Sequence, residues 1–287
     1  MEHRMKGYLP PMDPEKLKAL FEIENAFKAG QLSADEARLQ IKERVGKVSA
    51  YHVAYIEQTM TEETSNECIR EDVHAVINML GDQIDNTMPN LPADHPIMHY
   101  LKENEEMKRL LLAVEDLVQY PMIKNQWLEL YDKISQYPIH YKRKQNQLYP
   151  MLERKGFTRP TTTMWTFDDL VRDEIREAER LLREDKEEEF IKQQERVLMY
   201  ARDLMEKEEF ILYPTSMALI SEEEFEDMKS GDQEIGFAFF EVEHKTTENK
   251  VETQPKEQNN FANRAYFPQV SILGQATYQS EVTDLSK

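Results

Sequence analysis

Apolar residues recur three and four positions apart over most of the chain, and this spacing predicts helices. In the first 80 residues the predicted helices are short, and Ser33 with Glu36 forms a capping-box pattern at the start of one of them. Their predicted bounds are Asp13 to Gly30, Ser33 to Val45, Tyr51 to Met60 and Thr64 to Leu80.

A proline-rich break at residues 85–96 separates these helices from much longer apolar patterns. Four long helices joined by short connections predict an up-down four-helix bundle, so the expected fold is all-α. Residues 157–165 read as a loop, and a short fifth helix follows the bundle. The predicted helices are Asp94 to Val118, Met122 to Lys155 with a bend at Pro138, Thr166 to Glu184, Glu187 to Tyr213 with a stop at Pro214, and one capped by Ser221 with Glu224.

The pattern divides the chain into three parts. We expect a small helical module at residues 13–82, the four-helix bundle at residues 92–240 and a disordered tail at residues 243–287. The tail is rich in Asn, Gln, Thr and Ser and lacks periodicity.

Composition and charge narrow the functional classes. Only 8 residues are glycine, which disfavours hairpins and phosphate-binding loops. The formal net charge of −19 argues against nucleic acid and against anionic lipid as partners. The chain lacks an apolar run long enough for a membrane span and lacks a signal-peptide pattern near its start, so we expect a cytoplasmic protein. A single cysteine, Cys68, excludes an intrachain disulfide and reads as a buried structural residue.

One internal similarity carries information. Lys144–Pro150 resembles Glu208–Pro214, and this register places Gln145 opposite Glu209 and His140 opposite Leu204. Two helices that simply end with the same Leu-Tyr-Pro sequence would explain it. The alternative is a bundle of two related helix pairs that direct equivalent side chains at one interior site, as in di-iron carboxylate bundles.

The candidate metal ligands lie on the four long helices. His95 and His99 are four residues apart on the first, and His140 lies on the second. Asp169 on the third helix and Glu208 or Glu209 on the fourth would complete a site for iron, manganese or zinc. The opposing interpretation is that His95 caps a helix, His140 is a surface residue and the two glutamates belong to a solvated charge run.

Five segments in order resemble one family. Together they are similar to the bacterial hemerythrin-like (HHE cation-binding) domain, and residues 13–80 resemble the domain of unknown function 438 that precedes it in one branch. The segments are H-P-I-M-H-Y-L-K-E-N (His95–Asn104), H-Y-K-R-K-Q-N-Q-L-Y-P-M-L-E-R-K-G-F (His140–Phe157), M-W-T-F-D-D (Met164–Asp169), K-E-E-F-I-L-Y-P (Lys207–Pro214) and D-Q-E-I-G-F (Asp232–Phe237).

The resemblance implies a bundle with a non-haem, usually di-iron, centre. The ligands implied by position are His95, His99, His140, Asp169 and Glu208 or Glu209, with one or two iron ions and dioxygen or nitric oxide as small ligands. The sequence departs from the family pattern at Met98, Gln145 and Leu204, which leaves the site poor in histidine. The leading hypothesis is a protein that senses or handles iron, dioxygen or nitric oxide, with the N-terminal module as a contact for a protein partner.

Two rival hypotheses remain. In the first, the bundle is metal-free and the protein is a helical interaction or regulatory protein with a degenerate site. In the second, it is a redox enzyme that consumes peroxide or nitric oxide. The sequence contains no nucleophile motif, phosphate-binding loop or dinucleotide fingerprint, so a binding or sensor protein is favoured over an enzyme.

Overall fold

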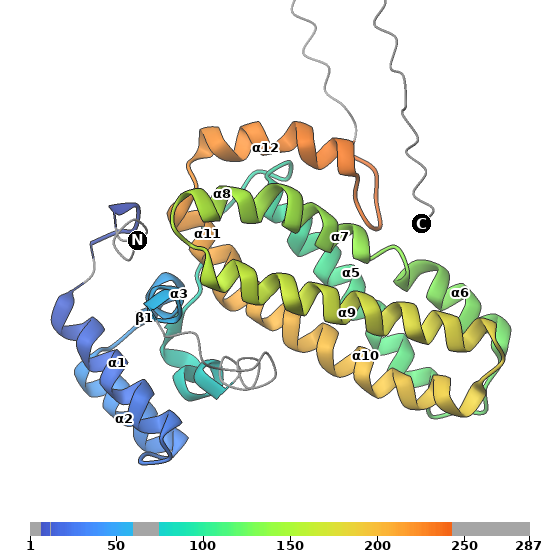
Figure 1. Ribbon diagram of the computed structural model, residues 1–287, viewed down its shortest axis with the longest axis horizontal. Coiled ribbons are helices and arrows are strands. Elements are labelled where there is room, and N and C mark those ends of the chain that lie inside the picture. Colours follow the sequence, from blue (N-terminus) through green and yellow to red (C-terminus); the bar gives the residue numbers. More distant parts are fainter. Residues whose placement is uncertain (1–6, 12, 60–74, 243–287) are drawn as a thin grey trace, which may run out of the picture. The chain divides into compact units, whose positions relative to one another are not determined.

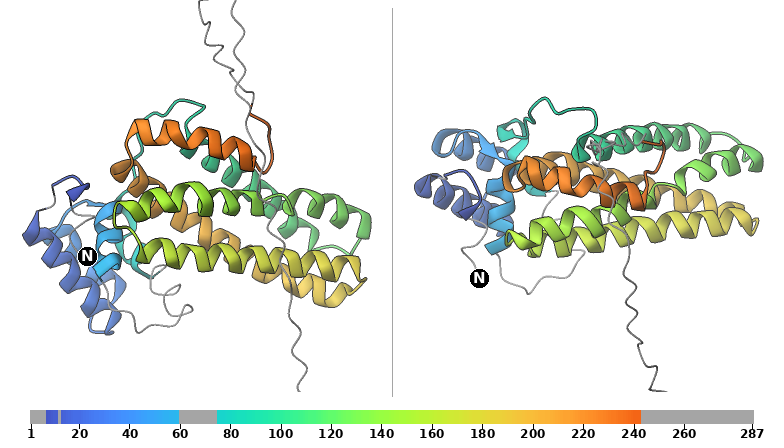
Figure 2. Two further views of the ribbon diagram at one scale, coloured as in Figure 1. Left: turned by 45° about the horizontal axis from the view of Figure 1, so that its top comes forward. Right: turned by 90° about the horizontal axis from the view of Figure 1, so that it is seen from above.

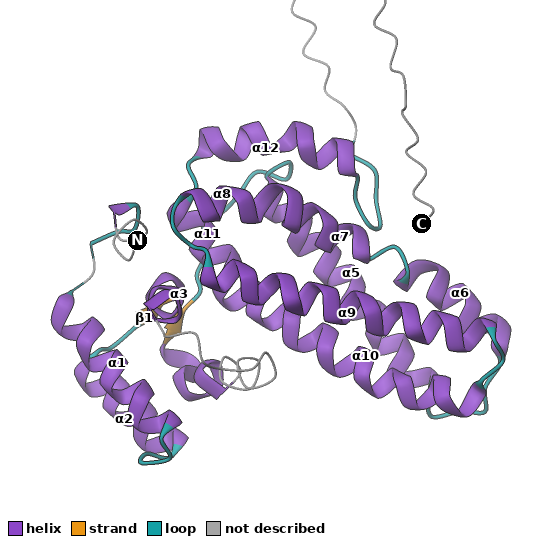
Figure 3. Cartoon of the chain, in the orientation of Figure 1, coloured by secondary structure: helices purple, strands orange, loops and turns teal. Residues whose placement is uncertain are grey.

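The computed structural model describes residues 7–11, 13–59 and 75–242, and helices dominate this part of the chain (Figure 3). The strands among the described residues are two segments of two residues each, β1 (Val48–Ser49) and β2 (Ile84–Asp85). They pair in parallel, with Val48 opposite Ile84. The all-α prediction is confirmed.

The N-terminal helices follow the predicted spacing. At the start of α1 the Asp13 carboxylate accepts a hydrogen bond from the Glu15 backbone N–H, and the predicted Ser33–Glu36 capping box is present at the start of α2. The predicted helix from Thr64 lies mostly outside the described residues. Cys68 and the tail at residues 243–287, which was predicted to be disordered, also lie outside them. Residues 75–80 are helical. The elements here are α1 (Pro14–Lys28), α2 (Ala34–Arg44), α3 (Ala50–Thr59) and η2 (Gly81–Gln83).

The long helices pack into a bundle around one apolar core. Figures 1 and 2 show α9 and α10 side by side along their whole length, with α5, α6 and α7 completing the bundle. The predicted bend at Pro138 is confirmed, because a turn at residues 135–137 separates α6 from α7. The bundle helices are α5 (Pro96–Leu117), α6 (Lys124–Ile134), α7 (Pro138–Arg143), α9 (Arg159–Arg183) and α10 (Glu187–Lys207).

The two similar segments fold in the same way. Each begins as a π-helix, η3 (Lys144–Leu148) or η4 (Glu208–Leu212), and continues into a short α-helix, α8 (Tyr149–Arg154) or α11 (Tyr213–Leu219). The predicted stop at Pro214 is therefore wrong. Proline is tolerated in the first turn of a helix, and the wider π turn before it lets the chain continue in a helical path.

A second correction concerns α9. It begins at Arg159, whereas the sequence predicted a loop up to a capping box at Thr166. The missing N-cap comes from α3, where the Gln58 side-chain oxygen accepts hydrogen bonds from the backbone N–H groups of Thr158 (2.9 Å) and Arg159 (3.0 Å). Thr166 instead donates its hydroxyl to the Thr162 carbonyl. Local sequence cannot reveal a cap that lies 100 residues away.

The last described helix, α12 (Glu222–Ile235), runs beside α7 and α8 (Figure 1). It begins with the predicted Ser221–Glu224 capping box. After Gly236 the chain turns back over the bundle, where Ala238 and the aromatic rings beside it pack against α5 and α7. None of the described helices has the length and apolar character that crossing a membrane requires.

Candidate functional site

Six ionisable side chains meet at the centre of the bundle with no exposure to solvent. Three are acidic and three are basic, and they come from α5, α7, η3, α9 and η4. Buried charges are costly unless they are paired, so their arrangement decides what this site can do. The six residues are Glu103, His140, Arg143, Lys144, Asp168 and Glu208, each 0% exposed.

Lys144 lies between two carboxylates. Its Nζ is 2.6 Å from Asp168 Oδ1 and also pairs with Glu208 Oε1. Burial opposes the charged ammonium, but Asp168 and Glu208 outweigh it and raise the pKa of Lys144. Tyr149 donates its hydroxyl to Asp168 at 2.8 Å, and Tyr213 donates to Glu208 at 3.0 Å. The equivalent tyrosines of the two similar segments thus hold the two carboxylates that flank one lysine.

His140 also lies between two carboxylates. Its Nδ1 is 2.8 Å from Glu103 Oε2, and its Nε2 is 3.4 Å from Glu208. Burial lowers the pKa of His140, but the carboxylates of Glu208 and Glu103 outweigh burial and raise it. Both ring nitrogens of an imidazolium donate hydrogen bonds, and neither then has a lone pair for a metal.

Arg143 completes the cluster. Its guanidinium donates two parallel hydrogen bonds to Glu103, at 2.8 Å and 2.7 Å, which is the strongest arrangement for such a pair. The same guanidinium lies over the rings of Tyr100, at 4.3 Å, and Phe237, at 4.5 Å. With His140 protonated, three buried anions face three buried cations, and the cluster is neutral without any added ion.

The six predicted ligand residues are not gathered in one place. His140 and Glu208 belong to the central cluster. Asp169 is 46% exposed and pairs with Arg172, while the half-buried Glu209 pairs with Lys108. Asp169 also accepts a hydrogen bond from the Gln145 side chain at 3.1 Å, so it lies at the edge of the buried cluster and not within it.

His95 and His99 lie near α12 and the segment after it. His95 is the N-cap of α5, with Nδ1 accepting the Ile97 backbone N–H at 3.1 Å, and its ring packs on Phe225. The ring of His99 contacts Phe237 at 4.8 Å between centroids. Burial and nearby Arg143 lower the pKa of His99 to about 4, so this imidazole is neutral. The role of all six residues as ligands stays a prediction.

Sequence reasoning missed four members of the cluster: Glu103, Arg143, Lys144 and Asp168. A signal for Asp168 was present, because Met164, Phe167 and Val171 place position 168, rather than 169, on the apolar face of the helix. Glu103 similarly lies one turn from His99 on the buried face of α5. A charged residue on an apolar stripe marks a buried ion pair as readily as a metal ligand.

The donors present do not fit a metal ion in this arrangement. Within the described residues, no group of three or more His, Cys, Asp or Glu side chains is placed to hold one. The two carboxylates that come nearest to such a group, Asp168 and Glu208, already share the ammonium of Lys144. A metal would have to displace this lysine and take a proton from His140.

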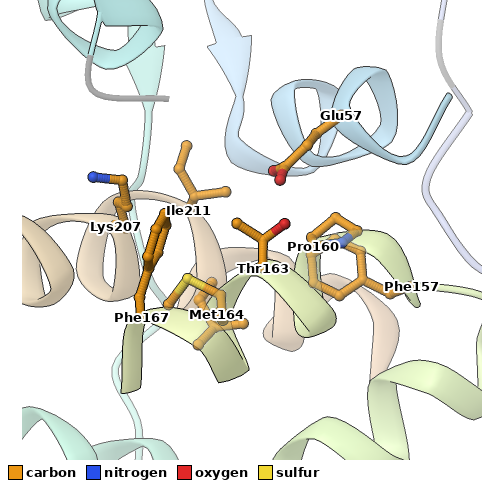
Figure 4. Close-up of a pocket in the computed structure, with 9 residues that line it drawn as sticks. Glu57, Phe157, Pro160, Thr163, Met164, Phe167, Lys207 and Ile211 are labelled. Carbon is orange, nitrogen blue, oxygen red and sulfur yellow. The ribbon is translucent and has the colours of Figure 1, made fainter. Parts of the chain in front are cut away.

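A small cavity lies where α3 meets the bundle (Figure 4). Glu57 of α3 points towards the cavity, and Phe167, Met164 and Ile211 of α9 and η4 form its apolar wall. Burial raises the pKa of Glu57 to about 7. Because Phe167 lies on α9 and Ile211 on η4, the cavity adjoins the two elements that carry Asp168 and Glu208.

Comparison with known proteins supports the assignment of the bundle. Curated proteins gave no match to this chain. The resemblance of residues 13–80 to the domain of unknown function 438 stays a prediction. Residues 95–216, which include every member of the buried cluster, match the family model described as Hemerythrin HHE cation binding domain.

Proposed function

We propose that this protein is a helical regulatory or interaction protein whose hemerythrin-like bundle works without a metal ion. The observation that carries this proposal is the Lys144 ammonium, which lies between the buried carboxylates of Asp168 and Glu208. A lysine in this position supplies the positive charge that a metal cation would otherwise bring to the carboxylates.

Electrostatics favour the lysine over an added cation. Removing a buried ammonium from two carboxylates breaks both ion pairs, and breaking such a pair costs about 3–5 kcal/mol. A metal must recover that cost before it gains any binding energy. Sites that hold iron or zinc tightly present neutral imidazoles and unpaired carboxylates instead.

The N-terminal helices are suited to transmit or receive a signal. α3 contacts α9, η4 and α11, and thus the elements that carry Asp168 and Glu208. Gln58 caps α9, and Glu57 lies beside the small cavity at the same junction. In this proposal a protein partner that binds the N-terminal module shifts α3, and α3 shifts the helices around Lys144.

Metal analysis tests the proposal. The full chain is produced with iron supplied, purified without air, and measured for iron, manganese and zinc. We expect far less than one ion per chain and an unchanged melting temperature after treatment with a chelator. One or two iron ions per chain, lost to the chelator together with stability, would overturn the proposal.

A second candidate function is iron binding with sensing of dioxygen or nitric oxide. The family match over residues 95–216 favours it, as does the presence of His140 beside Glu208, which shares the Lys144 ammonium with Asp168. This function requires Lys144 to leave the centre. It predicts near-ultraviolet absorption that changes when the iron-supplied protein meets air or nitric oxide, and the same preparation tests both candidates.

A further inference from the structure

The segment Gly236–Phe240 covers one side of the buried charge cluster, and we call it the latch. It follows the last turn of α12 and precedes the C-terminal residues. Ala238 at its centre is 2% exposed, while the phenylalanines on either side are half-buried. The latch has no helical or strand structure of its own, so contacts with the bundle hold it in place.

Two hydrogen bonds join the latch to the cluster. The Ala238 backbone N–H donates to Glu103 Oε1 at 2.8 Å. Arg143 donates from Nη1 to the Gly236 carbonyl at 3.2 Å. Glu103 and Arg143 are also paired with each other, so both hydrogen bonds depend on the state of one buried ion pair.

Aromatic contacts complete the closure. Phe237 packs between the His99 ring and the Arg143 guanidinium, and Phe239 stacks on Tyr137 at 5.8 Å between centroids. Phe240 lies under the ammonium of Lys102 at 3.9 Å. Phe237 and Phe240 thus pack against His99, and Phe237 also packs against Arg143, although these rings are themselves only half-buried.

The closed latch depends on a glycine and lies beside a buried acid that lacks a hydrogen bond. Gly236 has φ +94° and ψ −178°, a conformation that glycine adopts freely and that other residues rarely adopt. Asp232, on the last turn before it, is 1% exposed, and neither carboxylate oxygen has a hydrogen-bond partner in the described part of the chain. A buried polar group without a partner favours any state that returns it to water. The closed latch is therefore poised to open.

We propose that the latch responds to the buried charge cluster: when the Glu103–Arg143 pair is intact the latch is closed, and when the pair is disturbed it opens. This inference rests on the proposed function in taking the cluster as a regulatory element that is complete without metal. Coupling of this kind is reciprocal, so opening the latch must also weaken the ion pair.

Hydrogen–deuterium exchange of the full chain, resolved to peptides that cover residues 234–242, tests the coupling. Gly236→Ala strains the closed latch without a clash, because an added Cβ would meet no atom within 4 Å. We expect exchange in these peptides to rise roughly tenfold, with α9 peptides unchanged. Gly30→Ala is the matched control, since Gly30 has φ +70° and equally free space in the N-terminal module.

The cluster side of the coupling is tested with Glu103→Gln, which keeps the shape of the side chain and removes its charge. Exchange at residues 234–242 should rise as it does in Gly236→Ala. Unchanged exchange there would overturn the inference. If Glu103→Gln does not fold, the coupling is tested in Gly236→Ala by nuclear magnetic resonance of the His99 and His140 imidazoles. Imidazole resonances identical to those of the unaltered protein would also overturn the inference.

These results are separable from the metal question. Iron in the purified protein would refute the metal-free function while leaving the exchange experiment intact. Conversely, unchanged exchange of the latch in Glu103→Gln would refute the coupling, even in a protein that holds no metal.

Discussion

At the scale of single residues, Lys144 is the side chain on which the central cluster depends most. Lys144→Met removes the ammonium and leaves Asp168 and Glu208 as neighbouring buried acids. We expect a loss of about 3–5 kcal/mol in the free energy of unfolding, measured with urea. Lys108→Met is the control, because Lys108 is 39% exposed and its pairs with Glu105 and Glu209 are worth less than about 1 kcal/mol. Equal effects of the two substitutions would contradict the role given to Lys144.

The buried carboxyl group of Asp232 leads us to expect that the free energy of unfolding depends on pH. Burial raises its pKa from 3.8 to about 7, and Arg143, at 3.6 Å without a hydrogen bond, does not offset burial. The folded state therefore prefers the neutral acid, and ionisation costs stability as the pH rises from about 4 to about 7. Asp232→Asn removes this cost, so the variant should gain about 1–3 kcal/mol over the unaltered protein at pH 8.

The control for Asp232→Asn is the same comparison at pH 4, where both side chains are neutral and the gain should disappear. Thermal unfolding in matched buffers measures the difference. A gain that is the same at pH 4 and pH 8 would mean that shape, and not ionisation, separates the two side chains.

The site could be predicted only in part from the residues, because helical periodicity gives the face of a helix but not the partner of a side chain. His140 and Glu208 were named as candidates from their residue types, their places on two of the long helices and the family resemblance. Asp168 was missed in favour of Asp169, although the apolar stripe through Phe167 and Val171 pointed to 168. Lys144 was missed because a lysine beside an arginine resembles a solvated charge run, and its burial depends on contacts with other helices.

At the scale of elements, the long helices and all four short ones were predicted, since burial of one apolar face fixes each helix. Three of the short helices are confirmed as α1, α2 and α3, and the fourth lies mostly outside the described residues. The π-helices η3 and η4 were not predicted. A π-helix has about one more residue per turn than an α-helix, and this difference leaves no mark on the local composition. Only the similarity of Lys144–Pro150 to Glu208–Pro214 indicated that the two segments share a shape. The two segments share one local shape, and Lys144 and Glu208 at equivalent positions pair with each other. The relation between two whole helix pairs stays a prediction.

The cap that Gln58 provides is expected to stabilise the start of α9. Gln58 caps α9 from α3, so Gln58→Ala should expose the backbone N–H groups of Thr158 and Arg159 and cost about 1 kcal/mol. Faster hydrogen exchange over residues 158–163 would report the frayed end. Gln126→Ala, at an exposed position near the start of α6, is the control and should leave that exchange unaltered.

At the scale of the whole molecule, the net charge of −19 does not arise in the buried cluster. The buried cluster balances three acids against three bases, so it adds nothing to the total when His140 is protonated. The excess acid lies outside the cluster, and a net negative charge of this size opposes binding to nucleic acid and anionic lipid.

Contacts across the chain predict how the molecule unfolds. The sequence places a module boundary near residues 82–92, but α3 contacts α9, η4 and α11 and caps α9 through Gln58. We therefore expect α3 to unfold with the bundle, while α1 and α2, which contact each other, open at a lower free energy. Native-state hydrogen exchange over a series of low urea concentrations measures these free energies segment by segment. If the exchange of α3 follows that of α1 and α2 instead, the module at residues 13–82 is an independent unit, and the bundle is not coupled to it through α3.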